Sequence, residues 1–204
     1  MYTGLPYFVF GFHGCDQATK EAVLHGKVEL TPSTNNYDWL GSGIYFWEQN
    51  EKRAMDFAML SHKNPGKYTT KPIEAPAVIG AVIDLGFCMN LMDSAHISQL
   101  EVAYSQLEEI TKETGAKMPT NKGKGEDKPL RILDRAVIEM THELMKQSGV
   151  RQYDSVRGLF LEGPLAYPGA GFRKETHIQI CVRNIDCIKA YFDPREKADR
   201  PFLV

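Results

Sequence analysis

The sequence predicts one mixed α+β domain built around a split β-sheet. Two strand-and-helix pairs open the chain within residues 7–64, and three strand-like segments close it within residues 153–193. Two amphipathic helices are expected between them. A chain of 204 residues can bury one substantial core and is short for two, so residues 1–204 are expected to form a single domain.

The composition is that of an ordinary globular protein. Hydrophobic residues make up 43% and charged residues 25%, and the formal net charge is −2, which argues against disorder and against a broad nucleic-acid-binding surface. The first apolar run has no basic leader, and no stretch reaches the roughly 20 residues that span a bilayer. We therefore expect a cytoplasmic protein with no membrane partner.

The first strand, Tyr7 to Gly14, is rich in residues that favour β-structure and ends in a histidine followed by a glycine. Asp16 can cap a helix that begins at Gln17, and Gly26 is the expected end of that helix.

The second strand begins after two glycines, in the stretch LGSGIYFW. Gly41 and Gly43 indicate a tight entry, because glycine tolerates positive φ and lets a neighbour come close. Alternation then places Tyr45 and Trp47 on one face. Either that face belongs to an aromatic core or Tyr45 faces a ligand. The next helix is expected to start after Asn50, its cap.

The middle of the chain combines an apolar run with two helices. Residues 75–93 are typical of a strand covered on both faces. Amphipathic helices are predicted at residues 95–114 and 129–147, and the glycine- and lysine-rich joint between them should be mobile. Among the closing strands, residues 164–175 are expected to form a loop.

The four cysteines, at positions 15, 88, 181 and 187, show no paired spacing, and no cluster of histidine and cysteine has the spacing of a zinc site. We expect buried free thiols and no metal.

Three segments, in this order, resemble the ADP-ribosyltransferase superfamily, in its diphtheria-toxin and poly(ADP-ribose) polymerase-like branch. They are FHG at 12–14, GSGIYF at 41–46 and THIQICVRNIDCI at 176–188, and AVIDLGFCMNLMD resembles a further family strand. The resemblance covers about residues 7–91 and 156–192. It implies the split mixed sheet of that superfamily, with residues 95–148 as a helical insertion.

The resemblance implies that NAD+ is the substrate and binds between the strands of His13 and Tyr45. His13 would donate an imidazole N–H to a ribose hydroxyl, and the backbone of Gly14 would pair with the nicotinamide carboxamide. Gly43 would help admit the cofactor, the Tyr45 ring would stack on the nicotinamide, and Phe57 on the following helix would cover its other face. For Phe57, core packing is an alternative.

The third family position departs from the pattern. Apolar alternation along THIQICV puts Gln179 where the family carries a catalytic glutamate. A glutamine can hold a ribose hydroxyl but supplies neither an anion nor a base, which favours single transfer, hydrolysis or binding alone. Glu175 is the expected substitute carboxylate and Glu162 another candidate, with a solvated surface acid as the alternative for both. Arg53 and Ala54 stand where family members often have a hydroxyl residue that bonds the carboxamide.

Three functions are open on this evidence. The first is a mono-ADP-ribosyltransferase that cleaves NAD+ and transfers one ADP-ribose to a protein or nucleic acid. The second is a module of the same fold that binds NAD+ or ADP-ribose without turnover, and the third is a partner-binding protein acting through the helical insertion. The loop before the third motif is where the family contacts its acceptor, which implicates Tyr167, Phe172, Arg173 and Lys174.

Overall fold

The computed structural model describes residues 8–69, 71–123 and 130–195, in which a seven-stranded mixed sheet is combined with four α-helices. The strands are β1 (Phe8–Asp16), β2 (Ile44–Glu48), β3 (Pro76–Asp84), β4 (Cys88–Asn90), β5 (Ser155–Phe160), β6 (His177–Val182) and β7 (Ile188–Phe192). The helices are α1 (Gln17–Leu24), α2 (Glu51–Lys63), α3 (Ser94–Thr114) and α4 (Ile132–Gln147), and a 3-10 turn covers Ile185–Cys187. The predicted single α+β domain is confirmed.

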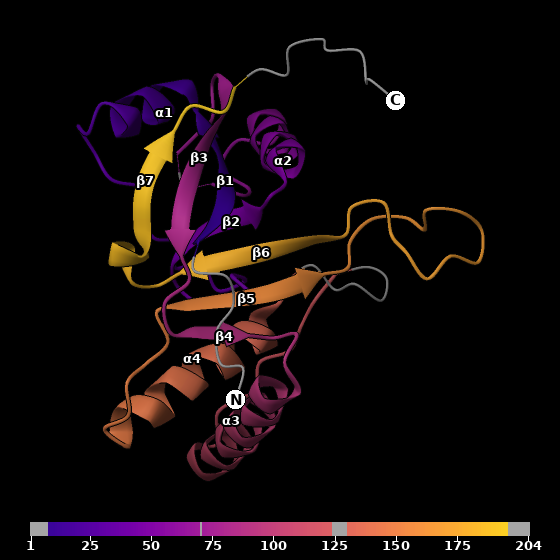
Figure 1. Ribbon diagram of the computed structural model, residues 1–204. Helices are drawn as coiled ribbons and strands as arrows, with labels where there is room; N and C mark the ends of the chain where they lie inside the picture. The colour runs from indigo at the N-terminus through magenta and orange to yellow at the C-terminus, as the bar shows by residue number, and fades with distance from the viewer. Residues whose placement is uncertain (1–7, 70, 124–129, 196–204) are drawn as a thin grey trace.

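The sheet changes direction where β1 meets β2. The strand order is β4-β5-β6-β2-β1-β3-β7, and β4 with β5 is the parallel pair among antiparallel neighbours. In Figure 1, β7, β3 and β1 run upright while β6, β5 and β4 lie across them. Two residue pairs join β1 to β2, Gly11 with Glu48 and Phe12 with Trp47. This short ladder is the link between the two halves of the sheet.

The main hydrophobic core lies between these halves. Val9 and Cys15 of β1 contribute to it from one half, and Ile44 and Phe46 of β2 from the other. Helix α1 adds Val23. Burial of these apolar side chains holds the two halves together across the short β1–β2 ladder.

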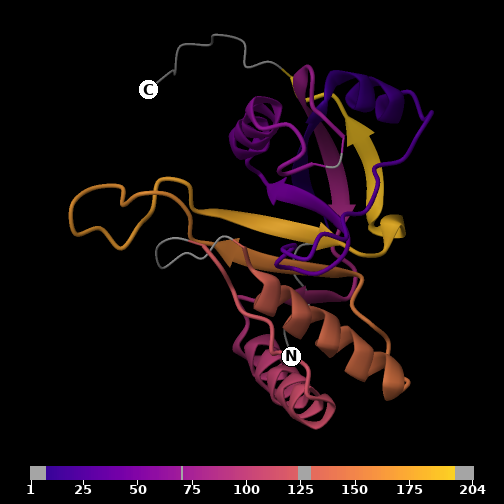
Figure 2. The ribbon, with the colours of Figure 1, turned by 180° about the vertical axis from the view of Figure 1, so that it is seen from behind.

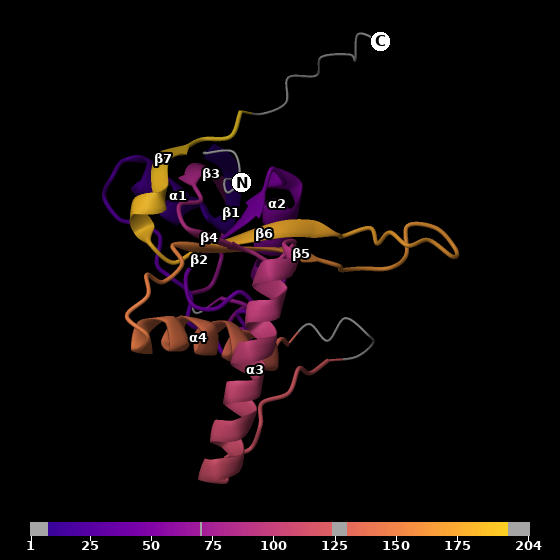
Figure 3. The ribbon, with the colours of Figure 1, turned by 60° about the horizontal axis from the view of Figure 1, so that its bottom comes forward.

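Helices α2 and α4 cover the same face of the sheet, each over a different half, since α2 packs on Trp47 and α4 packs near Tyr45, which share one face of β2. Helix α2 packs on β1 and β3, where Ala54 lies in a buried cluster with Trp47 and Val78. Helix α4 lies against the other half, where Ile138 packs in a cluster with Cys181. Figures 2 and 3 show α4 along this half, with α3 beside it.

The predicted helix caps are confirmed. Asp16 accepts a hydrogen bond from Ala18 N at the start of α1, and Asn50 accepts one from Arg53 N at the start of α2. Helix α3 ends at Gly115, whose φ of 67° is left-handed.

The run at residues 75–93 forms two strands in different halves of the sheet, so the prediction of one strand is wrong. Strand β3 pairs with β1, whereas β4 pairs with β5. The chain turns at Gly86, where φ is 57° and an added Cβ would lie 2.7 Å from Asp154 Oδ2. The same oxygen accepts a hydrogen bond from Phe87 N at 2.9 Å. A contact with a residue far along the chain therefore makes the break.

The predicted loop between β5 and β6 is an ordered hairpin, residues 161–176, that reaches away from the sheet (Figures 1 and 3). Its two sides are joined by backbone hydrogen bonds. Ala166 N donates to Phe172 O at 2.9 Å, and Lys174 N donates to Pro164 O at 3.0 Å.

Candidate functional site

The candidate site lies where β1 and β2 part. His13 follows the last residue pair of their ladder, and its Nδ1–H donates to the carbonyl oxygen of Tyr45 at 2.8 Å. The imidazole thus bridges the two strands just beyond the point where their ladder stops. Two motifs that are 32 residues apart in the sequence are joined directly.

The bond to Tyr45 fixes the tautomer of His13. A carbonyl oxygen only accepts, so Nδ1 carries the proton and Nε2 of the neutral ring is an acceptor. Burial lowers the pKa of His13, and the bond to the Tyr45 carbonyl opposes this in part. The expectation that His13 donates to a ribose hydroxyl is therefore corrected, because the neutral ring can only accept from one at Nε2.

Gly14 turns its backbone toward the same gap. Phe10 O accepts from Gln49 N at 2.9 Å, and every second residue of a strand directs its N–H and C=O to the same edge. Gly14 therefore faces β2 at a position beyond the end of the ladder at Phe12. On its Cα side, an added Cβ would lie 2.2 Å from Ala54 O. Helix α2 thus requires glycine here.

The Tyr45 side chain is fixed by two hydrogen bonds. Its hydroxyl donates to Gly41 O at 2.8 Å and accepts from Leu40 N at 3.0 Å. The half-buried ring packs on the cluster that contains Ile138 and Cys181. Burial raises the pKa of Tyr45 well above its usual value, so the phenol is neutral. The ring therefore packs on a core and is also rigidly placed beside the gap.

The two glycines before β2 make room for protein. Gly41 has a φ of 85°, and an added Cβ would lie 2.9 Å from Ile138 Cγ2 and 2.8 Å from Arg183 Nη1. At Gly43 an added Cβ would lie 2.5 Å from Val182 O. Close approach of α4 and β6 explains both glycines, and a cofactor contact at Gly43 stays a prediction.

Gln179 lies on the same sheet face as Tyr45. It pairs with Trp47 of β2, and Tyr45 pairs with Cys181, so the two side chains are diagonal neighbours. Gln179 Oε1 accepts from Trp39 Nε1 at 2.6 Å. The amide nitrogen of Gln179 has no hydrogen-bond partner among the described residues and is the group left to meet a ligand.

The substitute carboxylate lies just before β6 and is ion-paired. Glu175 Oε2 lies 3.8 Å from Arg53 Nη1, and Arg53 Nη2 donates to Glu162 Oε2 at 2.6 Å. One arginine of α2 therefore holds both candidate carboxylates at the base of the hairpin. From the sequence, Arg53 stands out only because it occupies a position where family members often have a hydroxyl residue, and its ion pairs were not predicted.

A closed polar cluster lies beside this arginine. His177 Nδ1 donates to Glu175 O at 2.7 Å, and burial lowers the pKa of His177 to about 4. Three buried nitrogens of this cluster have no hydrogen-bond partner among the described residues: Nε2 of His177, Nε1 of Trp47 and Nε of Arg53. Because these three atoms have no contact with solvent, the cluster is part of the packed fold and not an open pocket.

Phe57 packs among protein aromatic rings. Its ring centroid lies 5.1 Å from that of Trp47 and 6.5 Å from that of Tyr68. Trp47 follows Tyr45 by two residues and shares its strand face, so Phe57 covers the neighbour of Tyr45. A contact between Phe57 and nicotinamide stays a prediction.

The four residues expected to meet an acceptor lie on the hairpin. Tyr167 is 58% exposed and Phe172 is 71% exposed. Lys174 is exposed as well, whereas Arg173 Nη1 donates to Gly163 O at 3.0 Å. The hairpin thus presents two aromatic rings and a cation to solvent, away from the sheet.

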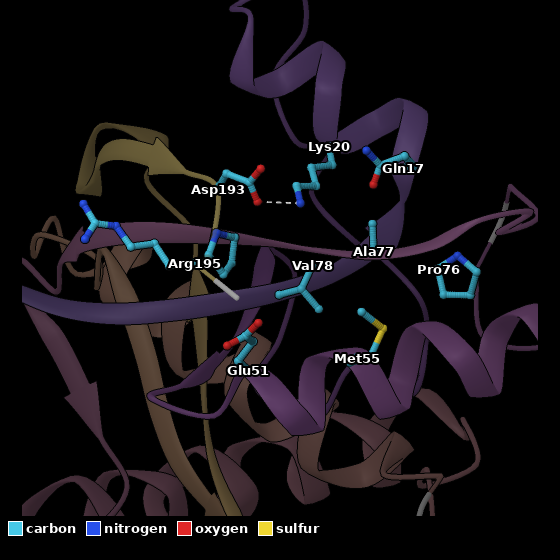
Figure 4. A pocket seen from close by; sticks show the side chains of 10 residues that line it. Gln17, Lys20, Glu51, Met55, Pro76, Ala77, Val78, Asp193 and Arg195 are labelled. Carbon is cyan, nitrogen blue, oxygen red and sulfur yellow. Dashed lines mark ion pairs between the residues drawn. The ribbon is translucent and has the colours of Figure 1, made fainter. Parts of the chain in front are cut away.

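Two cavities lie elsewhere in the described part of the chain. One, of about 560 Å³, opens between α1, α2 and the start of β3, with Met55 and the ion pair of Lys20 and Asp193, 2.6 Å apart, in its lining (Figure 4). The other, of about 470 Å³, is a mainly apolar groove between α3 and α4 that reaches Trp39. His13 lines neither.

Within residues 8–69, 71–123 and 130–195, no three His, Cys, Asp or Glu side chains gather as a metal site would require. The cysteines are free thiols, three of them buried. None of the four described helices has the length and apolar character needed to cross a bilayer.

Sequence reasoning missed two contributors to this region. Trp39, which bonds Gln179, stands directly before the glycine turn in the stretch YDWLGSG, and that adjacency was the available signal. Glu139 of α4 bonds Ser42 within the turn at 2.6 Å, and no local pattern links residues so far apart in the chain.

Comparisons with known proteins found one distant relative. Uncharacterized protein MJ0359 of Methanocaldococcus jannaschii is 24% identical over 211 residues, which cover 95% of this chain and 91% of that protein. No family model matches the chain, and no solved structure matches it. The chain is therefore similar, over most of the length of both, to a protein whose name assigns no activity.

Proposed function

We propose that this chain is a mono-ADP-ribosyltransferase that cleaves NAD+ and transfers one ADP-ribose to a macromolecular acceptor, on a split sheet of the ADP-ribosyltransferase type. The hydrogen bond between His13 and the backbone of Tyr45 carries the proposal. It brings two motifs of the family resemblance to one point, where β1 and β2 part. The change of direction of the sheet at that point supports the same fold type.

NAD+ would lie in the gap between these strands. His13 Nε2 would accept a hydrogen bond from a ribose hydroxyl, while the N–H and C=O of Gly14 match the acceptor and donor of a carboxamide. The fixed ring of Tyr45 offers an aromatic face to the nicotinamide. The amide nitrogen of Gln179 would donate to a ribose oxygen.

In the reaction, the bond between ribose C1′ and the nicotinamide nitrogen breaks, and its electron pair leaves with neutral nicotinamide. The acceptor nucleophile forms a new bond to C1′ and loses its proton to solvent or to a carboxylate. Gln179 supplies no negative charge for the cationic transition state, and Glu175 is paired with Arg53. We therefore expect single transfer at a modest rate and no polymer.

A second candidate function, binding of NAD+ or ADP-ribose without turnover, is favoured by one observation. Both carboxylates near the third motif position, Glu162 and Glu175, are engaged by Arg53. If neither can act on the acceptor, the site holds the nucleotide but does not release nicotinamide.

The test is incubation of the purified chain with labelled NAD+ and a cell lysate, with nicotinamide release and labelled macromolecules as readouts. His13→Ala should lower release about 10- to 100-fold, the effect of losing one buried hydrogen-bond partner. His25→Ala, at the exposed end of α1, is the matched control and should behave as wild type.

Gln179→Ala should stop release while NAD+ still binds. Equal release by wild type and His13→Ala would reject the site. Binding without release by wild type would select the second function.

A further inference from the structure

The helical insertion contacts the glycine turn before β2 through several side chains of α4, of which Glu139 is the central one. Glu139 Oε1 accepts from Ser42 N at 2.6 Å, and Arg183 Nη2 donates to Glu139 Oε2 at 3.1 Å. Arg183 Nη1 donates to Ser42 O at 3.2 Å. The N–H and C=O of the middle residue of the glycine turn are thus both held, one by α4 and one by the residue after β6.

A second side chain of α4 completes the contact. Arg135, one turn before Glu139, donates from Nη2 to Ser42 Oγ at 3.1 Å. The N–H, the C=O and the hydroxyl oxygen of Ser42 therefore each have a partner from outside the turn. We call Glu139, Arg183 and Arg135 the clamp on Ser42.

The clamp connects to Tyr45 through the neighbour of Ser42. Gly41 O accepts the Tyr45 hydroxyl at 2.8 Å, and Leu40 N donates to the same hydroxyl at 3.0 Å. Gly41 also lies against Ile138 of α4, with room for no Cβ. A displacement of Ser42 would therefore move the two backbone groups that fix the Tyr45 hydroxyl.

The charges within the clamp are well matched. Burial of Glu139 favours the neutral acid, but hydrogen bonds from Arg183 and Ser42 N outweigh burial and lower the pKa of Glu139 to about 2. The side chains of Glu139 and Arg183 are 30% and 19% exposed. Removing Glu139 would leave a largely buried guanidinium without its counter-charge.

We infer that Glu139 is a positioning residue, which holds Ser42 in place and thereby fixes the Tyr45 ring at the gap between β1 and β2. The clamp stands on its contacts alone, while its effect on catalysis rests on the proposed function. In this inference the insertion supports the site from behind and is not an independent docking element.

Hydrogen exchange across residues 38–47, followed by mass spectrometry, tests the clamp without reference to activity. Glu139→Ala should speed exchange at Leu40 and Ser42 about tenfold or more, because Ser42 N–H loses its acceptor and the freed turn no longer holds Leu40 N–H against the Tyr45 hydroxyl. Glu139→Gln keeps an acceptor for Ser42 N–H and should show a smaller increase. Glu143→Ala, one turn further along α4 and exposed, is the matched control and should exchange as wild type.

Wild-type exchange in folded Glu139→Ala would overturn the clamp, and if that variant does not fold, Glu139→Gln decides by the same criterion. For the site, KM for NAD+ should rise several-fold in Glu139→Gln with a smaller change in kcat, since Tyr45 is a binding group. Faster exchange with unchanged KM would overturn the positioning role. Absence of nicotinamide release by wild type would reject the proposed function, while the exchange result would still decide the clamp.

Discussion

Side chains are fixed where β1 and β2 part and exposed at the tip of the β5–β6 hairpin. His13 and Tyr45 have fixed hydrogen-bond partners and lie against packed strands. Tyr167 and Phe172 are more than half exposed, on a hairpin whose two sides are held together mainly by backbone hydrogen bonds. Rigid strands can place reacting groups, whereas an exposed hairpin can change its contacts without cost to the core. If the proposed function holds, chemistry and choice of acceptor reside in separate parts of the fold.

The largest expected effect is on stability, and it is seen by adding one methyl group to a glycine in each of the two regions. Gly14→Ala would place Cβ 2.2 Å from the backbone oxygen of Ala54, which cannot move aside, and should lower the free energy of unfolding by about 3 kcal/mol or more. Gly171→Ala in the hairpin meets nothing within 4 Å and should change it by less than about 0.5 kcal/mol. Denaturant unfolding measures both. Similar losses of unfolding free energy in the two variants would contradict the difference in packing between the two regions.

The second effect is a loss of stability in acid that depends on Glu139. The folded-state pKa of about 2 lies below the ordinary value of 4.5, so the ionised carboxylate is favoured by folding. Its contribution is fully present above about pH 4.5 and disappears as the pH falls toward 2. At pH 7 we expect the free energy of unfolding of wild type to exceed that of Glu139→Gln by about 2 kcal/mol, after allowance for the partial exposure of the Glu139 side chain.

Urea unfolding from pH 7 to pH 2.5 would follow that difference, and Glu143→Gln serves as control. Arg183 pairs with the carboxylate, buried His142 interacts with its charge, and Arg135 bonds Ser42 beside it; all three groups are present in each of the three proteins. A difference that stays constant with pH would contradict the assignment.

The smallest effect on stability is expected at the hairpin tip. Tyr167→Ser with Phe172→Ser removes two exposed rings and should change the free energy of unfolding by less than about 0.5 kcal/mol. Labelling of the macromolecular acceptor should fall, while the rate at which NAD+ is hydrolysed by water, measured as nicotinamide release without acceptor, should not change. A stability loss above about 1 kcal/mol would show that the rings pack on the fold, and unchanged labelling would remove the hairpin from acceptor recognition.

Features with a local cause could be predicted from the sequence. The caps Asp16 and Asn50 act within three residues of their partners, and the helices start where they indicate. Alternation along one strand predicted the sheet face on which Gln179 lies. The strand pairing agrees, because Gln179 pairs with Trp47 and Cys181 pairs with Tyr45.

Features set by distant contacts could not be predicted. The break at Gly86 depends on Asp154, 67 residues beyond the Phe87 amide that this aspartate binds. The bond between Trp39 and Gln179 spans 140 residues. The tautomer of His13 follows from the carbonyl of Tyr45, which only the parted strands bring within reach. In each case the sequence supplied the residue but not its partner.

The parallel pairing of β4 with β5 determines how the chain can be shortened. Two parallel neighbours need a crossover of about a dozen residues or more, because the chain must return to the same end of the sheet. Helices α3 and α4 are that crossover. Excising residues 95–148 would leave about ten residues between Cys88–Asn90 and the start of β5, most of them next to the strands, and would detach β4 from the sheet edge. A shorter chain of this type would have to lose the edge strand together with its helices, which makes the three elements a single unit of gain or loss.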